Sequence, residues 1–80
     1  STLDRSSAAS DVYKRQLIVN FYENVGNVRV IVTSSTGEVI YNEMVQTSTM
    51  PSLVIPLKDQ EKGVLQITDG YNNVYGFLFL

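Results

Sequence analysis

The sequence predicts an all-β domain built as an antiparallel sandwich or barrel, and three features lead to that prediction. Val28–Thr33 reads V-R-V-I-V-T, so β-branched residues alternate faces with period two, which fits a half-buried strand and not a helix. Thr36-Gly37 supplies a turn, because glycine adopts positive φ at little cost. About six short strands begin at intervals of roughly ten residues, a spacing typical of sandwiches and barrels.

The predicted strands are separated by segments rich in turn-forming residues. They cover residues 17–22, 28–34, 38–45, 53–57, a stretch around 65–68, and 74–80. Turns are expected at Asn24–Asn27 and Asp69–Asn73, where Asn, Asp and Gly tolerate left-handed backbone. The hairpin that spans Val28–Val45 should form the middle of a sheet.

Two of these strands carry signs of an edge position. In the strand at 38–45, Val39, Tyr41 and Val45 share a face with Glu43, so neither face is cleanly apolar and a bulge or an edge position is expected. Pro56 has no N–H to donate, which suits an edge strand or a strand end.

The last strand presents two apolar faces, although an antiparallel sandwich strand needs only one. One face holds Val74, Gly76, Leu78 and Leu80, and the other holds Tyr75, Phe77 and Phe79. Leu78 and Leu80 should enter the core. The aromatic face then calls for cover by a partner chain, a ligand or another segment, or else packs beside Ile18 and Tyr22 as a surface cluster.

Composition removes several classes of function. The chain has no Cys and no His, which excludes disulfides and thiolate metal sites and removes the commonest general base. Residues 17–80 hold three basic and six acidic side chains, a net charge of 3 − 6 = −3, so there is no basic stripe for nucleic acid. No apolar run is long enough to form a transmembrane segment.

Residues 1–16 resemble a translated sequencing adapter rather than a protein's own sequence. D-V-Y-K-R-Q matches the mosaic end of transposase-based libraries, and S-S-A-A-S matches the adapter upstream of it. This resemblance implies a non-native leader followed by a β-sandwich domain at 17–80 that lacks its first strand. The leader carries no pattern that packs, so it should not contribute to stability. The sheet edge left by a missing strand would favour self-association.

Three short patterns in residues 17–80 are similar to an uncharacterised family. They are N-F-x-x-x-x-G-N-V at Asn20–Val28, G-x-V-x-Y at Gly37–Tyr41, and Y-G-x-L-x-L ending at Leu80. They resemble a domain of unknown function found in small secreted Bacteroidetes proteins. The resemblance implies an immunoglobulin-like β-sandwich and a secreted, periplasmic or cell-surface location, and it supplies no catalytic residues.

A second resemblance points to the C-terminal sorting domains of type IX secretion. These domains share the G-x-V pattern, but Leu65 stands where they have Tyr, and their basic C-terminal end is missing. Under this alternative the chain would be the secretion-sorting domain of a larger exported protein.

The candidate sites favour binding over catalysis. Asp59 and Glu61 lie in the mixed-charge loop Lys58–Lys62, which is typical of solvated surface and not of an acid–base pair. The Asp69–Asn73 turn offers oxygen ligands, but it lacks the spacing of an EF-hand loop and is expected to be a plain turn. We therefore expect no catalytic, cofactor-binding or metal-binding residues.

The residues predicted to contact a partner are the exposed aromatics near the C-terminus. These are Tyr71, Tyr75, Phe77 and Phe79. Aromatic side chains at a strand end or in a loop can stack on a sugar or pack on a peptide. The sequence thus predicts a non-enzymatic extracytoplasmic module, binding or structural, whose partner is a protein or a glycan.

Overall fold

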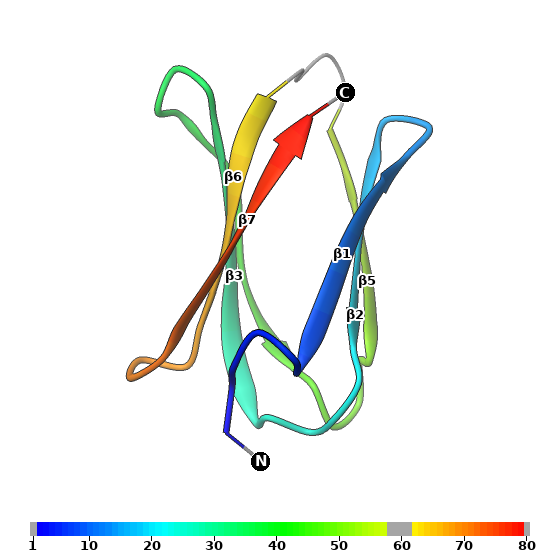
Figure 1. Ribbon diagram of the computed structural model, residues 1–80, viewed down its shortest axis with the longest axis vertical. Coiled ribbons are helices and arrows are strands. Elements are labelled where there is room, and N and C mark those ends of the chain that lie inside the picture. The colour runs from blue at the N-terminus through cyan, green and yellow to red at the C-terminus, as the bar shows by residue number, and fades with distance from the viewer. Residues whose placement is uncertain (1, 58–61, 80) are drawn as a thin grey trace.

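Seven β-strands and no helix make up the part of the chain that the computed structural model describes, residues 2–57 and 62–79. They are β1 (Ala8–Tyr13), β2 (Gln16–Phe21), β3 (Asn27–Ser34), β4 (Val39–Gln46), β5 (Ser52–Pro56), β6 (Lys62–Thr68) and β7 (Asn73–Phe79). Two antiparallel sheets, ordered β1-β2-β5 and β4-β3-β6-β7, face each other as the layers of a sandwich (Figure 1). The predicted all-β antiparallel sandwich is confirmed.

The core lies between the two sheets, and β3 is the central strand of its layer. Val28, Val30 and Val32 are completely buried, as the period-two pattern predicts. β3 pairs with β4 on one side and β6 on the other, so its backbone is hydrogen-bonded along both edges. The hairpin of β3 and β4 is therefore only half interior, because β4 is the outer strand of the sheet.

The opposite layer contributes its inner face in the same way. Leu17, Val19 and Phe21 of β2 are buried, as are Ile55 of β5 and Leu57 just after it. Full burial of each such side chain contributes roughly 1.5–3 kcal/mol to folding. This apolar layer explains how a small chain without cysteine closes a core.

Residues 2–16 form part of the fold, which their sequence did not predict. Residues Ala8–Tyr13 pair with β2 in register from Ala8 opposite Phe21 to Tyr13 opposite Gln16. Leu3 is 2% exposed and belongs to the core. The reason is that β2 offers unpaired backbone groups on this edge, and any extended segment can satisfy them.

Two expectations about the sheet edges change as a result. The sandwich has seven strands rather than about six, and the first-strand position is filled by β1 instead of being empty. β2 is paired on both sides, by β1 and β5, so the edge expected to promote self-association is closed. The open edges belong to the four outer strands β1, β5, β4 and β7.

The turn and edge predictions inside residues 17–80 agree with the structure. Gly37 has φ of 90° in the β3–β4 turn, where its N–H donates to the Ser34 carbonyl at 3.0 Å. β4 is an outer strand, and its register with β3 shifts between Val32 and Thr33, which is the expected irregularity. Pro56 ends β5, another outer strand.

Candidate functional site

β7 turns one face to the core and the other to solvent. Leu78 is 4% exposed and packs in the core, whereas Tyr75 and Phe77 are 60% and 72% exposed on the outer face. This alternation confirms the predicted assignment of faces for these three residues. Phe79 is the last residue of β7, and its side chain lies outside the described part, as does Leu80.

Tyr71 lies apart from the β7 aromatics, at the tip of the β6–β7 turn, and is 93% exposed. The turn is held by Asp69, whose Oδ1 accepts the backbone N–H groups of Tyr71 at 2.9 Å and Asn72 at 2.6 Å. Both bonds lower the pKa of the Asp69 carboxyl below 3.8, and the bond from Asn72 has the larger effect. The carboxylate is thus used by the turn itself, in line with the expectation of a plain turn.

Outward side chains of the neighbouring strands extend the β7 aromatics across the second sheet. The register places Val64 of β6 beside Phe77, Thr33 of β3 beside Val64, and Val39 of β4 beside Thr33. Four adjacent strands span roughly 14 Å at the usual strand spacing. Val39 is 54% exposed, so an apolar row reaches from one edge of the sheet to the other.

A second row runs parallel to the first through Tyr75. It contains Gln66 of β6, Ile31 of β3 and Asn42 of β4. We call the outward side chains of β4, β3, β6 and β7 the outer face. Met44, 55% exposed and opposite Arg29, belongs to it as well.

Sequence reasoning missed two members of the outer face. Sequence alone does not identify Met44 as a neighbour of the β7 aromatics, because that requires the sheet order. Val39 was placed on the face that holds Tyr41 and Val45. The register shift in the β3–β4 ladder turns Val39 outward, opposite Thr33.

The surface cluster expected from Ile18 and Tyr22 does not form at this site. Ile18 belongs to β2 in the other sheet and points outward there, since its neighbours Leu17 and Val19 fill the core. Tyr22 follows β2 and donates its N–H to the Ser7 carbonyl at 2.8 Å. Neither residue can cover Tyr75 or Phe77, so the outer face is open to solvent.

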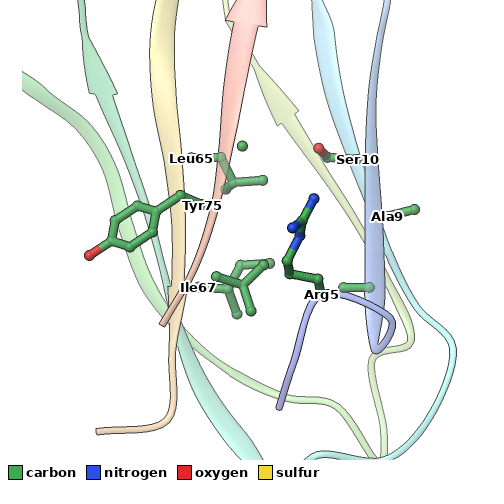
Figure 2. Close-up of a pocket in the computed structure, with 9 residues that line it drawn as sticks. Arg5, Ala9, Ser10, Leu65, Ile67 and Tyr75 are labelled. Atoms are coloured by element: carbon green, nitrogen blue, oxygen red, sulfur yellow. The ribbon is translucent and has the colours of Figure 1, made fainter. Parts of the chain in front are cut away.

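A cavity of about 110 Å³ lies between β1 and the second sheet, on the inner side of β7. Figure 2 shows the Arg5 guanidinium entering it, with Leu65 and Ile67 on one wall and Ser10 on the other. Tyr75 also contributes to the lining, but its ring points away from this space. Its walls combine small and aliphatic side chains with a single cation, which gives no acid–base pair.

No cluster of three His, Cys, Asp or Glu side chains is found in residues 2–57 and 62–79. Burial, with a smaller contribution from Glu43, raises the pKa of Tyr41 above its ordinary value. Asp59 and Glu61, weighed above as an acid–base pair, lie outside the described residues.

Within those residues, no helix has the length and apolar character needed to cross a membrane. A scan of known protein-family models finds no match to this chain, and a search of curated proteins finds none either. The resemblances to a secreted family and to an adapter therefore stay predictions. The outer face, with Tyr75 and Phe77 along its β7 edge, is the site that the geometry offers.

Proposed function

We propose that this chain is a non-enzymatic binding module that contacts a protein partner through the outer face of its second sheet. One observation carries the proposal: Tyr75 and Phe77 stand 60% and 72% exposed on a sheet whose opposite face already fills the core. Large aromatic side chains dominate the energetics of protein interfaces when they are buried there. Leaving them in solvent gives the isolated domain no such benefit.

The chemistry around the aromatics favours a protein over a glycan. Tyr, Phe, Met and Arg are enriched in protein interfaces, and Asp and Glu are depleted. The outer face combines Tyr75 and Phe77 with Met44 and Arg29, and its described residues include no carboxylate. The aliphatic row that ends at Val39 suits an apolar partner surface better than a sugar, which needs polar groups beside each ring.

Further support comes from composition and strand pairing. The absence of His and Cys from the sequence favours a binding role over catalysis. In immunoglobulin constant domains the first, second and fifth strands share a sheet, and the third, sixth and seventh share the other. The same sets occur here, which supports an immunoglobulin-like assignment, although the fourth strand lies beside the third and not beside the fifth as in constant domains. The proposed location outside the cytoplasm is supported by the family resemblance.

The test is selection of a displayed random-peptide library on the full chain, followed by affinity measurement with three variants. Tyr75→Thr and Phe77→Thr should each weaken the selected peptides at least tenfold, about 1.4 kcal/mol. Tyr22→Thr is the matched control, since it removes an equally exposed aromatic beside the other sheet. Peptides that ignore the outer-face variants would contradict the proposal, as would binding of arrayed glycans without any peptide binding.

A further inference from the structure

The four outer strands differ in how they are protected against pairing with another chain. β1 carries Asp11, β4 carries Glu43 pointing to the inner side opposite Val30, and β5 ends in Pro56. Charges, inward charges and prolines are the usual means by which edge strands avoid adding a further strand. β7 reads N-V-Y-G-F-L-F and has none of them.

The backbone of β7 also presents its free groups beside the exposed aromatics. Asp69 donates its N–H to the Asn72 carbonyl, so these two residues form a hydrogen-bonded pair at the start of the β6–β7 ladder. Along an antiparallel ladder, hydrogen-bonded residue pairs alternate with pairs that are not hydrogen-bonded to each other. The next hydrogen-bonded pairs are therefore Ile67–Val74 and Leu65–Gly76. The N–H and C=O groups of Tyr75 and Phe77 therefore point away from β6, toward the open edge.

We propose that the partner at this site is a second copy of the chain, whose β7 adds antiparallel to β7 and joins the two four-stranded sheets. The inference rests on the proposed function, because it keeps Tyr75 and Phe77 as the contact residues, and it adds the free backbone edge of β7 to that contact. An antiparallel addition of identical strands has two-fold symmetry, the commonest arrangement in homo-oligomers. Such symmetry brings like charges together on a charged strand, but residues Asn73–Phe79 contain no charge that would repel.

The symmetry also selects the register. A two-fold axis that passes beside Gly76 pairs the whole of β7 with β7 of the second copy, because Gly76 is the middle residue of Asn73–Phe79. Tyr75 then lies opposite Phe77 of the second copy, and the reverse pair forms on the other side of the axis. Both pairs use the free backbone groups and place two aromatic side chains side by side on the outer face.

Residue-resolved hydrogen exchange of the full chain, at dilute and concentrated protein, tests this pairing. The amides of Tyr75 and Phe77 should exchange at least tenfold more slowly in the concentrated sample, where sedimentation shows dimers. Val54 supplies the control. Leu57 donates its N–H to the Arg15 carbonyl, and Phe21 donates its N–H to the Pro51 carbonyl. Hydrogen-bonded pairs alternate between these two points of the β2–β5 ladder, so the N–H of Val54 faces the free edge of β5. Its exchange should not change with concentration.

A pair of substitutions at one position separates edge pairing from attraction between aromatic faces. Phe77→Thr removes the ring and keeps the N–H, whereas Phe77→Pro removes both without breaking a bond to β6. Edge pairing predicts at least tenfold weaker dimerisation for Phe77→Pro than for Phe77→Thr. Tyr75→Pro against Tyr75→Thr repeats the comparison if Phe77→Pro fails to fold.

The outcomes distinguish the two proposals. If Phe77→Thr and Phe77→Pro weaken dimerisation equally, edge pairing is overturned, while the proposal of binding by the outer face still stands. A chain that stays monomeric when concentrated, or a dimer in which the Tyr75 and Phe77 amides still exchange fast, would overturn the second-copy partner. The peptide selection would then decide the proposed function by itself.

Discussion

β1 and β7 border the same side of the sandwich, one in each sheet, yet they are held in different ways (Figure 1). The side chains of β1 are mostly short or polar, and most of them are exposed. β1 is therefore held in place mainly by its backbone pairing with β2. β7 anchors itself through Leu78 in the core and leaves its aromatic face to solvent. An edge strand can therefore close a sheet or offer a binding surface, depending on its side chains.

Truncating the inner anchor of β7 should have the largest effect on stability. Leu78→Ala is expected to lower the free energy of unfolding by roughly 2–4 kcal/mol, because it leaves a cavity among buried side chains. In a domain this small, such a loss takes away much of the total stability. Equilibrium unfolding in urea measures it, and a change within error would show that β7 is not anchored through this face.

Truncating the segment before β1 should cost somewhat less. Leu3→Ala is expected to lower stability by about 2 kcal/mol, the low end for a buried leucine, since the chain near a terminus relaxes easily. Thr2→Ala, an exposed neighbour, is the control and should change little. Equal urea midpoints for wild type and Leu3→Ala would restore the prediction that residues 1–16 do not contribute to stability.

The turn between β1 and β2 offers a stabilising change. Lys14 and Arg15 have φ of 51° and 63°, in the left-handed region that Asn and Gly adopt at lower cost. Lys14→Asn should raise the free energy of unfolding by about 0.5 kcal/mol, after loss of the exposed contact between Lys14 and the Tyr13 ring. Gly37→Ala, at φ of 90°, should shift thermal stability in the opposite direction.

The Asp69 turn gives a smaller effect that depends on pH. Its folded-state pKa lies below 3.8, so the ionised carboxylate stabilises the fold above 3.8, and this contribution fades as pH falls through the folded pKa. The wild-type advantage over Asp69→Ala should therefore be full at neutral pH and shrink on acidification. Urea unfolding of both proteins across this range measures it, and a constant difference would show that the carboxylate charge is not involved.

The contrast between β3 and β1 explains how far sequence alone reaches. β3 was predicted because valines at period two specify both its conformation and its buried face. β1 was missed because Ala8 and Ser10 give almost no apolar signal, and its strand conformation depends on the edge of β2, far more than on its own residues.

The candidate site divides along the same line. The exposure of Tyr75 and Phe77 followed from parity within one strand, which a sequence contains. The neighbours of these two residues on the outer face do not follow from parity, because Val39 reaches that face through a register shift and Ile18 lies in the other sheet. Sheet order and register come from pairing between distant segments, and a single sequence does not contain them.

The most direct test of the account compares two neighbouring residues of β7 in two measurements. Phe77→Thr should change the free energy of unfolding by less than about 0.5 kcal/mol in dilute solution and weaken self-association several-fold in sedimentation. Leu78→Ala should instead lower the free energy of unfolding strongly. If Phe77→Thr destabilises the dilute protein as much as Leu78→Ala, the outer aromatics serve the fold, and the binding surface assigned to β7 is wrong.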